Sequence, residues 1–544
     1  MSVQDLKAKP VSAAELSRAL ERGEEIAILD VRPEGFYSRG HMLYASCLPA
    51  NRMEMLVDRL VPRRDCPVVA IDEAGEAAPD AAAKLARLGY STVGWLEGGM
   101  KAWTRAGHVS FSGTNVPGKA LGELVEHELG TPFIEAAELK RRLDAGEDIV
   151  VLDSRPLQEF TDFSIPGAVS CPTAELVYRY FETVRSPDTL VVVNCAGRTR
   201  SIIGAQTLVN AGVPNRVVSL RNSTMGWLFE GYRLDRGRVR TAPAPSAQAL
   251  ARARSLARAL GQRAGVRHVD RDGLDEMVRQ SGERTLYLFD VRTPMEYRSG
   301  HLPGARLAEG GQLVQAYDEY AGTRNARVVL TDFDGVRAVV VASWLRQLGI
   351  DEVYVYDAGS ERRLDTGDEA LRILGERPAN RNWLQPDVLA AMLEQGEAAV
   401  FDIESTVAFR QGHIPGARFA ARDELERAAR TAGPRTAVVV TSSDGILAGV
   451  AAADLAAAGI PAAALLGGTR AWRSGGWPLE TSAEPFAPDT DVWYGPYAYS
   501  EEETFAAFRR YLDWEATLVD DLRREGDTRI RARNLNPGQP PGES

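Results

Sequence analysis

Apolar and polar positions follow one another along this chain in a pattern that repeats four times. Each repeat begins with a short apolar strand ending at an aspartate, and a turn then leads to a second apolar strand. A loop, a helix closing at a glycine and a third short strand complete the unit. Strands that alternate with helices are typical of a mostly parallel sheet. The pattern predicts an α/β chain of small sheets flanked by helices.

The strands and the helix ends of the four repeats can be located from this pattern. The first strands and their turns are Ile28–Arg32, Val151–Arg155, Leu288–Arg292 and Val400–Glu404. The second strands are Val68–Ile71, Leu190–Val193, Val328–Leu330 and Ala437–Val440. The helices that follow are expected to close at Gly89, Gly212, Gly349 and Gly459, because glycine accepts the left-handed conformation of a helix C-cap.

A chain of 544 residues is too long for one hydrophobic core, and each repeat has the size of a complete small domain. The linkers between repeats are read from a glycine-rich stretch, Ser112–Gly122, and a Pro/Ala stretch, Thr241–Ser246. A helix is predicted over Gln248–Arg263. The predicted division is residues 1–115, 116–241, 266–378 and 379–482 for the four domains, 242–265 for a linker and helix, and 483–544 for a C-terminal extension.

The extension differs from the repeats. Ser500 and Glu503 form a candidate capping box, and the apolar face of the helix that follows is Phe505, Phe508, Leu512, Val519 and Leu522. Such an apolar stripe is expected to pack on the fourth repeat, with docking of a partner as the alternative. The polar tail after Arg533 is expected to be disordered.

Charge and composition exclude several classes of function. The net charge of −11 and the lack of a basic block argue against a nucleic-acid partner. Four irregularly spaced cysteines and six scattered histidines predict neither a disulfide framework, a metal site nor a cofactor. The N-terminus lacks the apolar core of a signal peptide, and charged residues and a proline break the most apolar stretch, Ala437–Leu466. A cytoplasmic protein without a membrane partner is expected.

The loop after the second strand of the second repeat holds the clearest candidate for chemistry. Cys195 lies between the strand and an apolar-periodic run, Ile202–Leu208, that predicts a helix. A thiol there faces the positive end of the helix dipole and converging backbone N–H groups. Both stabilise the thiolate, which is the nucleophilic form of cysteine. The candidate binding loop that follows is Ala196, Gly197, Arg198, Thr199, Arg200 and Ser201.

The ordered set of motifs resembles the rhodanese family of sulfurtransferases. The set is Asp-x-Arg, Gly-His-x-Pro-Gly-Ala, a strand–Cys–loop–helix, and Leu-x-Gly-Gly with a tryptophan close behind. No single motif is specific, but the set recurs, with variations, in all four repeats. The resemblance implies four tandem rhodanese-like domains. It also implies that Cys195 takes sulfur from a donor as a persulfide and passes it to a thiophile.

Each part of the loop has a role under this resemblance. Arg198 and Arg200 are expected to bind the oxyanion end of the donor bidentately. Ser201 is expected to cap the helix or to donate to sulfur, and Gly197 permits a tight loop. Two arginines favour a strongly anionic donor such as thiosulfate, and glutathione persulfide remains open. The acceptor is cyanide or a thiol, and a protein sulfur acceptor remains open.

Alignment of the repeats restricts the chemistry to one of them. Asp72, Asp332 and Ser442 stand at the positions equivalent to Cys195. A carboxylate cannot form a persulfide and would repel an anionic donor, and no nearby histidine or lysine activates Ser442. Repeats one, three and four are therefore expected to be catalytically silent and to serve as scaffold, binding or interface domains.

Residues that recur in silent repeats are interpreted as structural. Asp153 and Arg155 have counterparts in silent repeats, so this pair is expected to support the loop as an ion pair. His41, His301 and His413 are absent beside Cys195 and are expected to stabilise turns. The remaining cysteines, Cys47, Cys66 and Cys171, are expected to be structural or incidental.

Two other functions are compatible with the sequence. A cysteine phosphatase or arsenate reductase would need an arginine one position beyond Arg200, where Ser201 stands. A non-catalytic sulfur carrier or scaffold would use the silent domains to dock partners and would turn over poorly with small donors.

Overall fold

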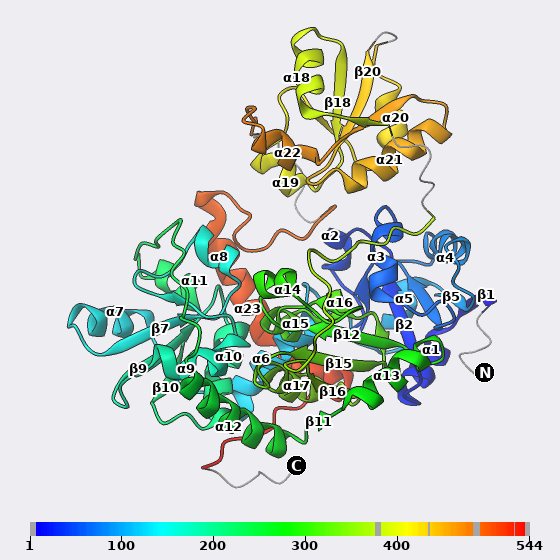
Figure 1. The fold of residues 1–544 in the computed structure, drawn as a ribbon. Helices are drawn as coiled ribbons and strands as arrows, with labels where there is room; N and C mark the ends of the chain where they lie inside the picture. The colour runs from blue at the N-terminus through cyan, green and yellow to red at the C-terminus, as the bar shows by residue number, and fades with distance from the viewer. Residues whose placement is uncertain (1–6, 376–381, 434–435, 482–489, 527, 539–544) are drawn as a thin grey trace.

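Four parallel sheets flanked by helices make up the computed structural model of this chain (Figure 1). It describes residues 7–375, 382–433, 436–481, 490–526 and 528–538. The sheets of domains 2, 3 and 4 have the strand orders β6-β10-β9-β7-β8, β11-β16-β15-β12-β13 and β17-β21-β20-β18-β19. Domain 1 has the order β1-β5-β4-β2, with β3 also on β2. The same α/β topology therefore occurs four times, as the repeat predicts.

The elements of domains 1 and 2 have the following bounds. In domain 1 these are β1 (Lys7–Val11), α1 (Ala13–Glu21), β2 (Ile26–Asp30), α2 (Glu34–Tyr37), β3 (Ser46–Cys47), α3 (Met53–Leu60), β4 (Val68–Ile71), α4 (Ala78–Arg87), β5 (Val93–Leu96) and α5 (Gly99–Arg105). After α6 (Val116–Leu129), domain 2 has β6 (Phe133–Ile134), α7 (Ala136–Asp144), β7 (Ile149–Asp153), α8 (Leu157–Asp162), β8 (Val169–Ser170), α9 (Glu175–Thr183), β9 (Leu190–Asn194), α10 (Thr199–Ala211), β10 (Val217–Leu220) and α11 (Ser223–Phe229).

Helix α12 (Ala247–Ala264) leads into the second half of the chain. Domain 3 has β11 (Arg267–His268), α13 (Arg271–Arg279), β12 (Leu286–Asp290), α14 (Pro294–Ser299), β13 (Arg306–Leu307), α15 (Gly310–Gln315), α16 (Tyr317–Tyr320), β14 (Thr323–Arg324), β15 (Arg327–Asp332), α17 (Arg337–Gln347) and β16 (Val353–Asp357). Domain 4 has β17 (Trp383–Leu384), α18 (Pro386–Glu394), β18 (Ala398–Asp402), α19 (Thr406–Gln411), β19 (Arg418–Phe419), α20 (Leu425–Ala429), β20 (Ala437–Thr441), α21 (Ile446–Ala457), β21 (Ala462–Leu465) and α22 (Gly468–Ser474). The extension forms α23 (Glu501–Glu525).

In each repeat, the first strand and the helix after the second strand end where the sequence predicts. The first strands β2, β7, β12 and β18 all end at the aspartate of the motif. The helices after the second strands close at glycines with positive φ, namely Gly89 (98°), Gly212 (79°), Gly349 (88°) and Gly459 (78°). This is the conformation in which glycine carries little steric penalty. The helix predicted before domain 3 is α12.

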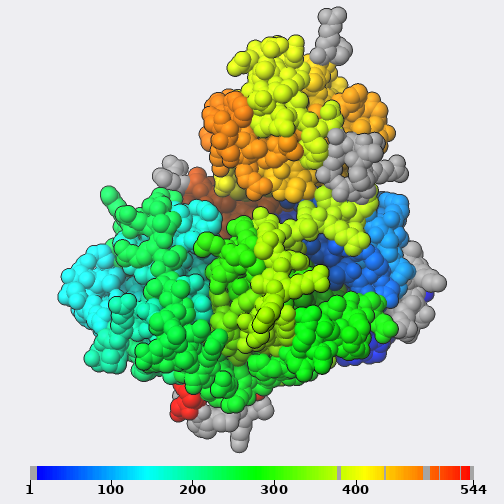
Figure 2. Space-filling model, in the orientation of Figure 1, coloured from blue at the N-terminus to red at the C-terminus, as the bar shows by residue number. Residues whose placement is uncertain are grey.

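The first three domains are joined by shared structure. Strand β14, which lies in the domain 3 sequence, pairs antiparallel with β2 of domain 1. Domains 2 and 3 share one hydrophobic core, in which the Trp344 indole donates to Thr207 Oγ1 at 2.8 Å. Figure 2 shows domains 2 and 3 as one continuous surface, with domain 4 above it. Within the described ranges, no helix combines the length and the apolar character needed to cross a membrane.

The segment between domains 1 and 2 corrects the predicted loop-like linker. Residues 116–129 form a helix, α6, whose first ten residues are all buried. Two of its glycines lie against neighbouring chain segments. A methyl group at Gly118 would clash with the Gln315 carbonyl, and one at Gly122 would lie 2.9 Å from Thr199 Cγ2. These glycines permit close packing of a helix, a use that the sequence alone does not distinguish from a flexible linker.

The extension corrects a second expectation. Helix α23 packs on α6, and its buried Leu518, Val519 and Leu522 belong to the core shared by domains 2 and 3 (Figure 1). The prediction that it packs on domain 4 is wrong, because its apolar face is matched by the apolar helix α6. Ser500 is the N-cap residue, but its side chain donates to Glu503 and caps no backbone N–H group.

The tail after Arg533 is ordered as far as residue 538. Leu535 is buried, and its carbonyl oxygen accepts a hydrogen bond from Arg263 Nε of α12 at 2.7 Å. The Arg533 N–H donates to Gln347 Oε1 at 2.8 Å. The expected disorder is therefore wrong for residues 534–538, where Leu535 has a hydrogen-bond partner on α12. Residues 539–544 lie outside the described residues.

Candidate active site

Cys195 lies between the end of β9 and the start of α10, and its side chain is almost completely buried. Its Sγ is 3.4 Å from the Ser223 hydroxyl, and its N–H donates to the same hydroxyl at 3.0 Å. Ser223 opens α11, at the carboxyl end of the neighbouring strand β10. The thiol thus lies at the carboxyl ends of two parallel strands, where α/β proteins bind ligands.

The backbone N–H groups of the Cys195 loop are left without protein acceptors. Among the hydrogen bonds of the described residues, none is donated by the N–H groups of residues 196–200. They lie just before and in the first turn of α10, where a helix has positive potential. The loop therefore presents a set of donors and a thiol to the same region of space.

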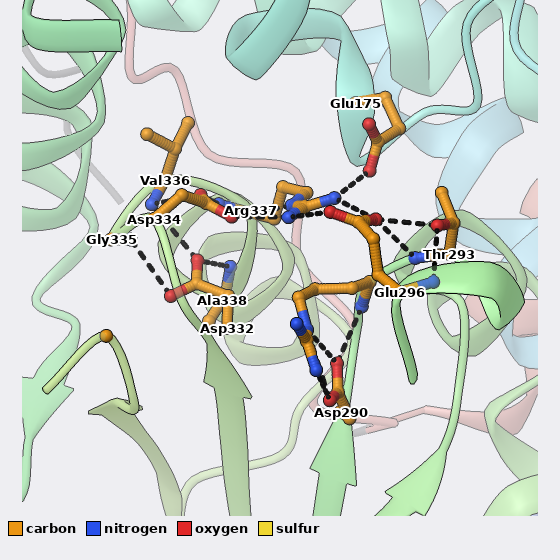
Figure 3. Close-up of polar contacts among 12 residues, drawn as sticks. Glu175, Asp290, Thr293, Glu296, Asp332, Asp334, Gly335, Val336, Arg337 and Ala338 are labelled. Atoms are coloured by element: carbon orange, nitrogen blue, oxygen red, sulfur yellow. Dashed lines mark hydrogen bonds and ion pairs between the residues drawn. The ribbon is translucent and has the colours of Figure 1, made fainter. Parts of the chain in front are cut away.

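In the silent domains 1 and 3, the equivalent backbone N–H groups donate to an aspartate carboxylate of the same loop. Asp332 accepts from the N–H groups of Gly335, Val336 and Ala338 at 3.0, 3.0 and 2.9 Å (Figure 3). Asp72 likewise accepts from the N–H groups of Gly75, Ala77 and Ala78. The aspartates therefore occupy the place of a bound anion, which blocks these loops as well as removing the nucleophile.

In domain 4 the side chain at the equivalent position is a serine hydroxyl, which also accepts a backbone hydrogen bond. The Ser442 hydroxyl is buried and accepts from the Ala448 N–H at 3.3 Å. Of the four equivalent loops, the one in domain 2 combines a thiol with N–H groups that have no acceptor.

The two loop arginines are already bound to carboxylates. Arg198 donates to both oxygens of Glu123 at 2.7 Å and also to Glu126, both on α6. Arg200 donates to Glu159 at 2.7 and 2.8 Å and to Gln312 of domain 3 at 2.8 Å. The expected bidentate contact between these guanidiniums and the donor is not available in this structure, because they fix the loop to α6, α8 and α15 instead.

An equivalent arginine in domain 3 supports this structural interpretation. Arg337 binds Asp334, Glu296 and, across the domain boundary, Glu175 of α9 (Figure 3). Arg200 and Arg337 thus make reciprocal contacts, each binding a glutamate of its own domain and a residue of the other. Because domain 3 has Asp332 in place of the cysteine, the same arginine contact forms without a nucleophile and is interpreted as structural.

This ion pair leads to a pH-dependent prediction. Burial raises the pKa of Glu296, but Arg337 and Thr293 outweigh it and lower that pKa from 4.5 to about 2. Glu296 therefore contributes stability that is complete above pH 4.5 and is lost as the pH falls toward about 2. We expect Glu296→Gln to lower the unfolding free energy by about 1–2 kcal/mol at neutral pH and to remove part of the acid-dependent loss. Denaturant titrations across this pH window measure both.

The exposed Glu283 of the same domain provides the control for that experiment. Glu283→Gln should keep the wild-type stability and acid dependence. Equal acid dependence in wild type and Glu296→Gln would contradict the assignment of this stability to the Arg337 ion pair.

The C-terminal extension covers the Cys195 loop. Tyr497 donates to the Ala196 carbonyl at 3.1 Å, and Glu515 Oε1 accepts from the Thr199 hydroxyl at 3.1 Å. A methyl group at Gly197 would lie 3.1 Å from Tyr511 Cε1 and 3.7 Å from Glu515 Oε2. Figure 1 shows α23 running beside domain 2. Sequence motifs did not reveal Tyr497, Tyr511 and Glu515, which lie in the segment outside the repeats.

Three polar residues behind the loop hold it in place, namely Ser201, Asp153 and Arg155. Ser201 donates to the Arg198 carbonyl at 2.8 Å and accepts from Ser223, so it neither caps α10 nor contacts the sulfur. Asp153 and Arg155 are fully buried and joined at 2.9 and 2.7 Å. Asn194, next to Cys195, donates to the same carboxylate at 2.7 Å. The pair thus contacts the strand end that carries the thiol.

The other candidate residues lie away from this site. His41, His301 and His413 stack on Tyr37, Tyr297 and Phe409 in the turns where they were predicted. Burial raises the pKa of Cys47, Cys66 and Cys171, for Cys66 to about 11, which keeps these thiols protonated.

Cavity size does not identify the site. A cavity of about 810 Å³ lies between domains 1, 3 and 4 and includes Cys47 in its lining. Cys47 is the last residue of β3, and burial raises its pKa. The described part of the chain contains no group of three or more His, Cys, Asp or Glu side chains able to hold a metal ion.

Comparisons with known proteins agree with the repeat. A family model described as "Rhodanese-like domain" matches residues 12–106, 135–230, 271–362 and 385–475. A crystal structure of thiosulfate sulfurtransferase from Pseudomonas aeruginosa is 42% identical with a TM-score of 0.87, over 96% of this chain and 99% of that chain. Because the match covers nearly the whole of both chains, the likeness extends beyond a single domain.

Two curated relatives match shorter regions. A protein named "Putative thiosulfate sulfurtransferase" from Synechococcus elongatus is 31% identical over 169 residues, 25% of this chain and 53% of its own length. An HTH-type transcriptional regulator from Mycobacterium tuberculosis is 32% identical over 111 residues, 20% of this chain and 48% of its own. The chain therefore spans about half the length of these two relatives.

Proposed function

Because this chain belongs to the rhodanese-like domain family, we propose that it is a sulfurtransferase with one catalytic domain, domain 2, and three silent ones. The observation that carries this proposal is the contrast between the four loops. The N–H groups beside Cys195 have no protein acceptor, whereas Asp72 and Asp332 fill the same donors in domains 1 and 3. A site that leaves converging donors open next to a thiol is suited to hold an anion there.

The reaction has two steps. The Cys195 thiolate attacks the outer sulfur of thiosulfate, the S–S bond of the donor breaks, and sulfite leaves with the bonding electrons. A thiophilic acceptor then attacks the outer sulfur of the resulting persulfide, and Cys195 leaves as thiolate. Both resting forms of the cysteine are anionic, so the same N–H donors stabilise both.

The roles of the loop residues follow from their contacts. The N–H groups of Ala196, Gly197, Arg198, Thr199 and Arg200 bind the anion. Arg198 and Arg200 act as positioning residues, since their guanidiniums tie the loop to carboxylates on α6 and α8. Ser223 is an addition to the predicted set, because its hydroxyl lies 3.4 Å from the Cys195 sulfur.

The alternative functions differ in what they require of this site. A phosphatase needs guanidinium donors aimed at a tetrahedral anion, and here both loop arginines are engaged by glutamates. A carrier that docks a protein partner needs access to Cys195, and here the extension lies over its loop. The geometry therefore favours transfer between small molecules.

The test is to load the wild-type protein with thiosulfate and to measure the intact mass and the sulfite released. We expect one sulfur atom to be added per chain, with one equivalent of sulfite. Thiosulfate should load faster than mercaptopyruvate. Thiosulfate carries two negative charges, whereas mercaptopyruvate carries one, on its carboxylate. Absence of any sulfur adduct on the wild-type protein would refute the proposed function. An adduct without turnover by small acceptors would favour the carrier.

A further inference from the structure

The Cys195 site contains a buried carboxylate from outside the repeat. Glu515 of α23 is fully buried, and its Oε1 accepts hydrogen bonds from the Thr199 hydroxyl at 3.1 Å and the Tyr511 hydroxyl at 2.8 Å. Its second oxygen, Oε2, has no hydrogen-bond partner among the described residues. That oxygen faces Gly197, two residues from the nucleophile, at 3.7 Å from where a methyl group would be. An unsatisfied buried oxygen is costly unless a ligand or a proton satisfies it.

The surroundings of Glu515 hold it ready for proton exchange. Lys119 and Glu123 face it from α6, Arg198 from the loop, and Tyr511 from its own helix. Cys195 in turn faces Tyr511. Burial raises the pKa of Glu515 to about 7, an effect that Glu123 adds to and that Lys119 and Arg198 oppose. The carboxyl group therefore changes its protonation state near neutral pH, as a general acid–base does.

The positive partner of Glu515 is held rigidly. The Lys119 ammonium lies 4.7, 5.3 and 4.8 Å from the ring centres of Trp493, Tyr511 and Trp514. Asp318 and Glu319 of α16 add negative potential, whereas Arg200 adds positive potential. When Glu515 is protonated, its neutral carboxyl group no longer balances the positive charge of Lys119. The positive potential at the site then favours entry of an anionic donor.

Resting on the proposed function, we infer that Glu515 is the general acid–base of sulfur transfer and that the natural acceptor is a small thiol. After thiosulfate has loaded Cys195, protonated Glu515 gives its proton to the outer sulfur of the persulfide. The carboxylate then removes the proton of the incoming thiol, and the thiolate attacks that outer sulfur. The S–S bond of the persulfide breaks, Cys195 leaves as thiolate, the product is a hydropersulfide, and Glu515 again holds a proton.

This cycle balances without any further reactant. The net reaction converts a thiol and thiosulfate into a hydropersulfide and sulfite, and the proton carried by Glu515 comes from one thiol and returns to one persulfide. Cyanide needs no proton removed before it attacks. The two acceptors therefore make different demands on Glu515.

The size of the acceptor follows from the cover over the site. Tyr497, Tyr511 and Glu515 lie over residues 196–199 and leave Cys195 only 2% exposed. A cysteine on a folded partner would have to displace the extension to reach this thiol, whereas a small thiol needs much less space.

The experiment compares two acceptors in Glu515→Gln, which keeps the shape of the side chain and removes its proton exchange. Thiosulfate is the donor, and the acceptors are dithiothreitol and cyanide. Dithiothreitol is followed as the sulfide that its second thiol displaces from the hydropersulfide product as the cyclic disulfide forms, and cyanide is followed as thiocyanate. We expect kcat with dithiothreitol to fall about 10²-fold and kcat with cyanide to change by less than about threefold. Loading of Cys195 by thiosulfate, measured by mass, should remain complete.

The pH dependence of kcat provides a second readout. In the wild type, kcat with dithiothreitol should fall as the pH rises through about 7, because an ionised Glu515 has no proton to give to the persulfide, and Glu515→Gln should lack this fall. Lys119→Met should move this fall to higher pH, because the ammonium favours the ionised carboxyl and its removal keeps Glu515 protonated to higher pH. Asp513→Asn, an exposed position on the same helix, is the matched control and should behave as wild type.

The outcomes separate the two proposals. An equal loss with both acceptors in Glu515→Gln, or no loss with either, would overturn the acid–base role while wild-type loading still supports the sulfurtransferase. If the wild-type protein itself acquires no sulfur from thiosulfate, the proposed function fails, and the role of Glu515 fails with it.

Discussion

Replacing Cys195 by serine is expected to abolish persulfide formation and to lower sulfur transfer from thiosulfate to cyanide by more than about 10³-fold. The hydroxyl that replaces the thiol fits the same space beside Ser223 but ionises far too weakly to attack the donor. Silent copies cannot compensate, because Asp72, Asp332 and Ser442 stand at the equivalent positions. The loss is measured as thiocyanate production and as intact mass after incubation with thiosulfate.

Cys47→Ser is the matched control for this experiment. Cys47 is the last residue of strand β3 in domain 1, and its thiol lies 3.9 Å from the Arg32 carbonyl oxygen. Burial raises the pKa of Cys47, so it contributes no thiolate at neutral pH. The control should keep wild-type turnover and the full mass gain. Sulfur bound to Cys195→Ser, but not to Cys47→Ser, would place the nucleophile in domain 1 and contradict the assignment.

The sequence predicts the parts of the site that lie within one repeat. The strand that ends before Cys195, the loop after it and the helix closing at Gly212 follow from local patterns of apolar residues and glycine. The comparison of repeats also singles out Cys195 and its three non-equivalent counterparts. These features depend on contacts between residues close in the chain, which is why periodicity reveals them.

The residues that cover the site could not be predicted in this way. Thr199 and Glu515 are bonded although 316 positions separate them, and no repeat holds a counterpart of α23. Likewise, Gly118 and Gly122 resemble linker glycines, and their packing role depends on Gln315 and Thr199 from two other domains. Local sequence patterns do not indicate which distant part of the chain a helix packs against, so such contacts are found only in the folded structure.

The role of Asp332 was also only half predicted. Sequence comparison indicates a missing nucleophile and an electrostatic barrier to an anionic donor. The structure adds that the carboxylate accepts three backbone N–H bonds. The silent loops of domains 1 and 3 therefore keep the geometry of an anion site while supplying the anion themselves. This explains how a catalytic loop can be lost without loss of the fold around it.

Replacing Asp153 by asparagine is expected to destabilise domain 2 by about 3–5 kcal/mol. The carboxylate accepts from Arg155 Nε and Nη2 at 2.9 and 2.7 Å and from Asn194 Nδ2 at 2.7 Å. An amide would turn an N–H group toward these donors and leave the buried Arg155 charge without a counter-ion. Arg155 is also stacked 4.6 Å from the Phe163 ring, so it cannot easily turn toward water.

Domain 4 shows the consequence of lacking the arginine. Glu404 stands at the position of Arg155, and burial raises the pKa of Asp402 to about 7. An aspartate at this buried position thus tends to take up a proton when no guanidinium neutralises it. In domains 1, 2 and 3 an arginine two residues further on binds the aspartate instead.

Asp290→Asn in domain 3 is the matched variant, since Asp290 binds Arg292 in the same way beside a silent loop. If the pair is structural, both variants lose stability to a similar extent, and Asp153→Asn keeps its kcat at temperatures where domain 2 stays folded. Hydrogen exchange of peptides from β9 and β15 would assign the loss to each domain. A fall in kcat of Asp153→Asn beyond about tenfold with normal exchange protection would instead show that the pair acts in catalysis.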